Sequence, residues 1–182
     1  MELAISWLRE KGKPSRVLET GIGSGCISVS IALGVENSNI VATELSYRSL
    51  MVARQNIEKY DLLNRVSLVQ ADLLSPLRGK FDLLCANLPY IPTGKLKDLD
   101  VSRHEPAAAL DGGADGLFYL RKWIAASKRF VKRPGLLLAE IEENQADRVI
   151  TLAEKVFPQE SISVWKDYAG KPRILRVGCE EK

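Results

Sequence analysis

The stretch from residue 16 to residue 33 constrains the fold of this chain most. It begins with the strand-like run RVLET, continues through the glycine-rich loop GIGSG at residues 21–25, and ends in the apolar run CISVSIAL. Glycines permit positive φ and let the backbone approach a ligand, to which a helix N-terminus presents its free N–H groups. The order strand, glycine loop, helix predicts the first half of a nucleotide-binding unit, although a simple tight turn would also give such a loop.

Strand-like and helix-like segments alternate along the rest of the chain. Helices are expected at residues 2–11, 26–33, 46–60, 116–133 and 145–156, and strands at 16–20, 39–43, 65–70, 81–86, 136–141, 161–166 and 172–177. Residues 167–171 suit the loop of an antiparallel hairpin. The pattern predicts an α/β fold with a doubly wound, Rossmann-like, seven-stranded sheet that is mostly parallel with one antiparallel strand. We expect one domain over residues 1–182, with a helical lead-in at 1–14.

Two acidic residues follow expected strands. Glu44 lies about 20 residues after the glycine loop, where a carboxylate can accept hydrogen bonds from both hydroxyls of an adenosine ribose. It could instead cap the following helix, as Ser46 also could. Asp72 could accept a hydrogen bond from an adenine amino group or be a turn residue. Because the second glycine spacing of a dinucleotide site is missing, the pattern favours S-adenosyl-L-methionine over NAD.

The segment FDLLCANLPYIP, residues 81–92, combines an apolar strand with an abrupt polar end. The strand runs directly into Asn87, which Pro89 and Tyr90 follow closely. In open α/β sheets ligands bind at the carboxyl edge, where this amide should be exposed. The sequence therefore predicts that the reactants meet at Asn87.

Composition argues against several other classes. The net charge is only +3, and the one short basic cluster, at residues 128–133, reads as the solvated end of a helix, so nucleic acid is not the expected partner. Three widely spaced cysteines and a single histidine, His104, predict neither a disulfide framework nor a metal site, and His104 receives no role. No run approaches the roughly 18 apolar residues of a membrane span, and no signal peptide is evident. We expect a cytoplasmic protein.

Six segments carry a resemblance to a known family. The chain resembles the catalytic domain of the HemK/PrmC family of protein-(glutamine) methyltransferases, over residues 16–177, in LETGIGSGCISVSIA, ATELSYRSLMVARQN, FDLLCANLPYIP, HEPAAALDGGADGLFYLRKWI, LLLAEIEENQ and WKDYAGKPRIL. The resemblance implies a class I methyltransferase fold and methyl transfer from S-adenosyl-L-methionine, which leaves S-adenosyl-L-homocysteine. The implied acceptor is a glutamine side-chain nitrogen, typically in the Gly-Gly-Gln loop of a peptide-chain release factor.

The resemblance also assigns site residues. The expected cofactor site comprises Glu19, Gly21, Gly23, Gly25, Glu44, Leu45, Asp72, Leu73 and Asn87. The expected catalytic residues are Asn87, Leu88, Pro89 and Tyr90, and the expected substrate contacts are Asn87, Pro89, Tyr90 and Glu105.

The chemistry gives the residues at 87–90 a reason. An amide nitrogen is a poor nucleophile because its lone pair is delocalised into the carbonyl, so the site has to orient that lone pair toward the methyl group. The Asn87 side-chain oxygen and the backbone carbonyl of Leu88 can accept hydrogen bonds from the two N–H groups of the amide nitrogen. Tyr90 can pack on the flat amide. Such catalysis depends on positioning and electrostatics and needs no strong base before the methyl moves.

Two departures from the family pattern bear on the substrate. The family usually has N-P-P-Y, whereas Leu88 replaces the first proline here; Pro89 still favours an extended Leu88, and we expect activity in a slightly looser loop. N-L-P-Y is also common among adenine-amino methyltransferases of ribosomal RNA, so methylation of adenine in RNA or DNA is the alternative function. Family members generally carry a helical N-terminal substrate-recognition domain, which we expect to be absent, leaving substrate recognition to the loop at 93–114.

Overall fold

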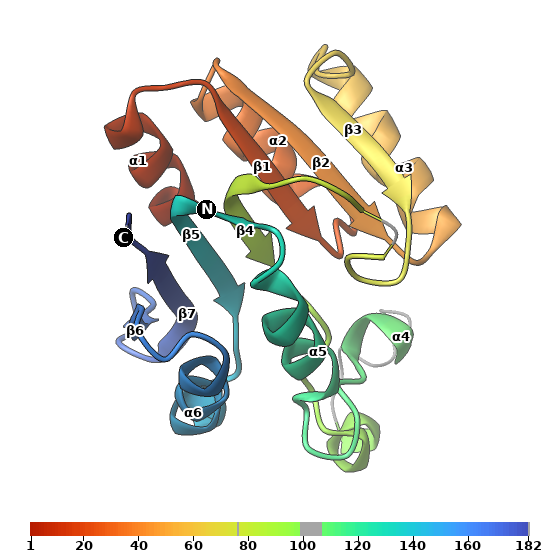
Figure 1. Ribbon diagram of the computed structural model, residues 1–182. Helices are drawn as coiled ribbons and strands as arrows, with labels where there is room; N and C mark the ends of the chain where they lie inside the picture. Colours follow the sequence, from red (N-terminus) through yellow and green to blue (C-terminus); the bar gives the residue numbers. More distant parts are fainter. Residues whose placement is uncertain (76, 99–106, 182) are drawn as a thin grey trace.

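One twisted sheet organises the chain. The computed structural model describes residues 1–75, 77–98 and 107–181 (Figure 1). The strands are β1 Ser15–Thr20, β2 Ser38–Glu44, β3 Val66–Gln70, β4 Phe81–Ala86, β5 Val131–Glu140, β6 Ser161–Lys166 and β7 Pro172–Cys179. The α-helices are α1 Glu2–Lys11, α2 Cys26–Gly34, α3 Tyr47–Lys59, α4 Ala107–Leu110, α5 Phe118–Ser127 and α6 Ala146–Val156, and the 3₁₀ helices are η1 Thr93–Asp98 and η3 Glu143–Gln145.

The strand order confirms the predicted topology. The sheet runs β3-β2-β1-β4-β5-β7-β6. The first five strands pair in parallel, and β7 is antiparallel to both β5 and β6. The chain moves outward from β1 to β3 and then returns to place β4 on the other side of β1. In sheets of this kind ligands bind at such a switch point, at the carboxyl ends of the central strands.

Two layers of helices cover the two faces of the sheet, so both faces of β1 and β4 at its centre are largely buried. Val17 of β1 packs in one apolar cluster with residues of α1, α2 and α3, whereas its neighbour Leu18 packs in the other with residues of α5 and α6 (Figure 1). All six residues of β4 are buried. No helix in the described part of the chain is long and apolar enough to cross a membrane.

The start of β5 corrects two predicted boundaries. The helix expected over 116–133 covers only Phe118–Ser127, and Pro134-Gly135 lies inside β5 instead of forming a turn before it. Val131 already pairs with Phe81 of β4, and the register then shifts so that the next pair is Leu83 with Leu136. A proline has no backbone N–H to donate to the neighbouring strand, so it is tolerated where the regular pairing is interrupted.

A buried carboxylate ties the amino end of β4 to its surroundings. Asp82 is 3% exposed, and it accepts hydrogen bonds from the Arg16 backbone N–H at 2.7 Å and from Nζ of Lys132 at 2.9 Å, and forms an ion pair with Lys11. Burial acts to raise the pKa of Asp82, but the hydrogen bonds outweigh it and hold this pKa below its usual value. Asp82 therefore joins β4 to α1, β1 and β5.

Replacing Asp82 with alanine should lower the free energy of unfolding by about 2–3 kcal/mol, because a buried N–H and two lysines lose their partner. Urea denaturation at pH 7 measures the change. Asp147→Ala, at an exposed position in the first turn of α6, is the matched control and should cost no more than about 0.5 kcal/mol. Equal midpoints for the two variants would contradict this role of Asp82.

Candidate cofactor and active site

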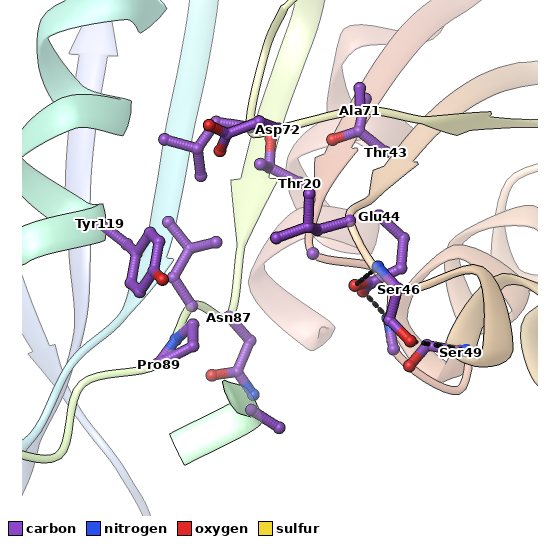
Figure 2. A pocket seen from close by; sticks show the side chains of 16 residues that line it. Thr20, Thr43, Glu44, Ser46, Ser49, Ala71, Asp72, Asn87, Pro89 and Tyr119 are labelled. Atoms are coloured by element: carbon purple, nitrogen blue, oxygen red, sulfur yellow. Dashed lines mark hydrogen bonds between the residues drawn. The ribbon is translucent and has the colours of Figure 1, made fainter. Parts of the chain in front are cut away.

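A cavity of about 240 Å³ lies at the carboxyl ends of the central strands. Figure 2 shows the side chains around it, including Thr20 at the end of β1, Glu44 at the end of β2, Asp72 after β3 and Asn87 after β4. The predicted site residues that line it are Gly21, Gly23, Glu44, Leu45, Asp72, Leu73, Asn87, Leu88 and Pro89. The tertiary structure therefore gathers most of the predicted site at one edge of the sheet. Glu19, Gly25 and Tyr90 are not part of this lining, and Glu105 and His104 lie outside the described residues.

Glu44 holds the glycine loop against the start of α3. Its Oε2 accepts a hydrogen bond from the Gly23 backbone N–H at 3.1 Å, and its Oε1 accepts one from the Ser46 N–H at 2.9 Å. Ser46 is the N-cap of α3, because its hydroxyl accepts a hydrogen bond from the Ser49 N–H (Figure 2). Glu44 also lines the cavity, and a carboxylate oxygen can accept more than one hydrogen bond.

The glycine loop has the backbone conformation that its composition predicts. Gly21, Gly23 and Gly25 have φ values of 73°, 55° and 86°, which other residues rarely adopt. No atom outside residues 22–24 lies within 4 Å of the position that a Cβ on Gly23 would occupy, so the backbone here is open to a ligand. Gly25 instead packs against Ala53 of α3, at 3.4 Å from the Cβ position to the Ala53 Cβ, and fixes the packing of α2 on α3.

Leu88, the residue that departs from the usual motif, has a packing role. Its side chain is 7% exposed, belongs to the core, and lies 3.2 Å from the position of a Cβ on Gly21. It therefore packs against the glycine loop from the β4 side. Asn87 beside it is exposed, although β4 before it is wholly buried. This confirms that the strand delivers a polar amide to the edge of the sheet.

A second cavity, of about 230 Å³, is also lined by Asn87. It lies between the start of α1, the start of α2, and the ends of β4 and β5, and Glu140 is part of its lining. Asn87 is thus common to the two cavities. The Tyr90 hydroxyl makes a long hydrogen bond of 3.5 Å to Oε1 of Glu140, and burial together with this carboxylate raises the pKa of Tyr90. Stacking of Tyr90 on a substrate amide stays a prediction.

Glu19 is buried in the core beneath the site. It is 1% exposed, and its carboxyl accepts a hydrogen bond from the Ser28 hydroxyl of α2. Burial raises the pKa of Glu19 to about 8, despite the hydrogen bonds from Ser28 that act in the opposite direction. Burial and the proximity of Glu19 also raise the pKa of the Cys85 thiol. The predicted contact of Glu19 with the cofactor stays a prediction.

The raised pKa of Glu19 predicts a pH-dependent stability. As the pH rises above 4.5 the carboxyl ionises in the unfolded chain first, so the free energy of unfolding should fall until the folded-state pKa of about 8 is passed. We expect a loss of at least about 2 kcal/mol, since one pKa unit corresponds to about 1.4 kcal/mol. Urea denaturation from pH 5 to 8.5 should show this fall in the natural chain and a flatter profile in Glu19→Gln. The exposed control Glu36→Gln should keep the natural slope, and a slope unchanged in Glu19→Gln would contradict the assignment.

The run ALDGGADGL shapes the loop that follows the site. Asp111 accepts hydrogen bonds from the Thr93 hydroxyl at 2.7 Å and the Gly113 N–H at 2.9 Å, so it joins the start of η1 to the segment after α4. A Cβ on Gly112 would lie 2.8 Å from the Pro89 carbonyl oxygen, so only glycine permits this approach. Asp115 accepts from the Leu117 N–H at the start of α5. These residues hold the loop after β4 in place.

Some lining residues carry no local sequence signal. They are Thr20, Thr43, Ser49, Ala71, Ala109 and Tyr119. Tyr119 comes from α5, far along the chain from Asn87, and only packing of α5 on the sheet brings it to the cavity. Among the described residues, no group of His, Cys, Asp and Glu side chains could hold a metal ion.

The fold, the glycine loop and the strand-end acids define the class of this protein: it has the fold of class I S-adenosylmethionine-dependent methyltransferases. The structure of ribosomal protein L11 methylase from Lactobacillus delbrueckii subsp. bulgaricus matches it with a TM-score of 0.66, at 20% identity, over 99% of this chain and 77% of that chain. A family model described as methyltransferase small domain matches residues 2–104. The chain belongs to this family.

Curated relatives are more similar in sequence. A release factor glutamine methyltransferase from Moorella thermoacetica is 42% identical over 161 residues, which cover 87% of this chain and 57% of that protein. A ribosomal protein uL3 glutamine methyltransferase from Burkholderia pseudomallei is 36% identical over 140 residues, 72% of this chain and 46% of that protein. The chain thus spans about half the length of the curated relatives it matches.

Proposed function

We propose that this chain transfers a methyl group from S-adenosyl-L-methionine to the side-chain amide nitrogen of a protein glutamine, in the Gly-Gly-Gln loop of a peptide-chain release factor. The observation that carries the proposal is the position of Asn87. Its exposed amide ends a buried strand and adjoins both cavities. A donor bound on the Glu44 side can therefore meet an acceptor amide at this residue.

The residues around the first cavity fit the adenosine part of the cofactor. Glu44 and Asp72 both line this cavity, and in the proposed complex Glu44 accepts hydrogen bonds from the ribose hydroxyls and Asp72 accepts one from the adenine amino group. Leu45, Ala71 and Leu73 give the apolar walls that a flat base requires. The open backbone at Gly23 permits close approach. When bound, the cofactor supplies an electrophilic methyl group on a sulfonium.

Positioning of the acceptor nitrogen falls to the residues after β4. The Asn87 side-chain oxygen and the Leu88 carbonyl oxygen each accept a hydrogen bond from one N–H group of the acceptor amide. These two hydrogen bonds turn the nitrogen lone pair toward the methyl group. These two hydrogen bonds also stabilise the positive charge that develops on the nitrogen. After the methyl transfer the nitrogen loses a proton to water. Positioning and electrostatic stabilisation together lower the activation free energy by several kcal/mol.

The names of the relatives support a protein acceptor. They include release factor glutamine methyltransferases and a ribosomal protein uL3 glutamine methyltransferase. Both kinds of acceptor belong to the translation machinery, so the proposal includes a cytoplasmic location.

Methyl-labelled S-adenosyl-L-methionine tests the proposal. The chain is incubated separately with a release factor, with the same factor carrying Gln→Ala in its Gly-Gly-Gln loop, with ribosomal proteins, and with ribosomal RNA. We expect label on the intact factor and none on the Gln→Ala factor. Label on ribosomal protein alone would replace the substrate but keep the reaction, whereas label on RNA alone would reject a protein acceptor.

A further inference from the structure

One buried amide outside both cavities contacts the loop that carries Asn87. Gln145 ends η3 at the start of α6 and is 4% exposed. Its Nε2 donates hydrogen bonds to the Tyr90 carbonyl at 3.0 Å and to the Gly116 carbonyl at 3.2 Å. Its Oε1 accepts one from the Glu142 N–H at 3.1 Å. A single side chain thus joins three segments that are distant in sequence.

The packing around Gln145 leaves the Tyr90 carbonyl little freedom. A Cβ on Gly116 would lie 2.3 Å from the Tyr90 carbonyl oxygen and 2.7 Å from Nε2 of Gln145. Gly116 also has φ +74°, which favours glycine. The carbonyl is therefore enclosed between the Gly116 backbone and the Gln145 amide.

The segment from Asn87 to Pro89 is consequently fixed at both of its ends. At one end it continues β4, which pairs with β1 and β5. At the other end Gln145 holds Tyr90, and the Ile91 N–H donates to the Leu110 carbonyl at 3.0 Å. The position of the Tyr90 carbonyl thus determines the path of the short segment that contains both acceptors of the proposed site.

We propose that Gln145 is a positioning residue for methyl transfer, which acts by holding the Tyr90 carbonyl and thereby aiming the Asn87 side chain and the Leu88 carbonyl. The inference rests on the proposed function and extends it to a residue that contacts neither reactant. An amide suits this position because two buried carbonyls need a donor while the Glu142 N–H needs an acceptor. Reactions that depend on near-attack geometry can lose about 100-fold in rate for a displacement of about 1 Å.

Two variants of Gln145 separate positioning from bulk packing. Gln145→Glu keeps the size but turns a carboxylate toward two carbonyls, and Gln145→Met keeps the volume without any donor. Each should lower kcat by about 30- to 100-fold, with the Kd for S-adenosyl-L-homocysteine changed less than about 3-fold. Gln55→Glu, on the exposed side of α3, is the matched control and should leave both constants unchanged. Circular dichroism establishes that each variant is folded.

Three further readouts distinguish positioning from a general loss of structure. The first is a pH profile: the kcat of Gln145→Glu, relative to the natural chain, should rise as the pH falls, because a protonated carboxyl can again donate a hydrogen bond. In an Asn87→Ala background, Gln145→Glu should cost less activity than in the natural chain, since part of its effect passes through the Asn87 side chain. Hydrogen exchange of the peptide covering residues 87–92 should be faster in both variants.

The outcomes separate this inference from the proposed function. A natural chain that labels no acceptor would reject the proposed function itself. An active natural chain, together with a folded and equally active Gln145→Met, would overturn the role of Gln145. So would a parallel loss of cofactor affinity, or full additivity with Asn87→Ala, because either would mean that Gln145 acts on the domain as a whole.

Discussion

Replacing Asn87 with alanine should lower kcat for methyl transfer about 1,000-fold while cofactor affinity changes less than about 3-fold. In the proposed mechanism the side-chain oxygen orients the amide nitrogen, and loss of one such preorganised group typically costs a factor of about 100 to 1,000 in rate. The variant should still fold, because the Asn87 side chain is exposed and is not part of the buried core that β4 forms. Initial rates with labelled cofactor and a release factor measure the effect.

The control for Asn87 is Asn39→Ala. Asn39 is also exposed but lies near the amino end of β2, at the opposite edge of the sheet, and its replacement should leave kcat unchanged. Isothermal titration with S-adenosyl-L-homocysteine checks that the cofactor site survives in Asn87→Ala. Undiminished methylation by Asn87→Ala would remove the observation on which the proposed function rests.

Replacing Glu44 with alanine should raise the Kd for the cofactor by at least about 100-fold. In the proposed site this carboxylate accepts two charge-assisted hydrogen bonds from the ribose, and hydrogen bonds to a charged group contribute about 1.5–3 kcal/mol each. It also holds the Gly23 and Ser46 N–H groups, so the glycine loop loses a support in the variant. Titration with S-adenosyl-L-homocysteine gives the Kd directly and requires no methyl acceptor.

A conservative variant and a control test the result for Glu44. Glu44→Gln keeps one acceptor oxygen and should lose affinity by a smaller factor, about 10-fold. Glu58→Ala, at an exposed position of α3, removes a carboxylate of the same kind outside the cavity and should leave the Kd unchanged. If Glu44→Ala bound the cofactor as tightly as Glu58→Ala, Glu44 would be only a support for the helix start.

The sequence alone determined the sheet and the positions at its carboxyl edge. Apolar runs bounded by turns located each central strand, and in a parallel sheet all these strands end at the same edge. Residues placed at or just after a strand end, such as Glu44, Asp72 and Asn87, were therefore predictable as neighbours. The positive φ at Gly21, Gly23 and Gly25 also follows from a local rule.

Only the tertiary structure decided how this edge is held together. Leu88 packs on Gly21, and Tyr119 reaches the cavity from α5. Gln145 donates a hydrogen bond to the carbonyl of Tyr90, which lies 55 positions before it. The strand β5 begins at Val131 because it finds a partner in β4, which overrides the Pro134-Gly135 turn signal. Periodicity and turn chemistry report which face of an element is apolar and where it ends, whereas these contacts depend on which distant elements pack together.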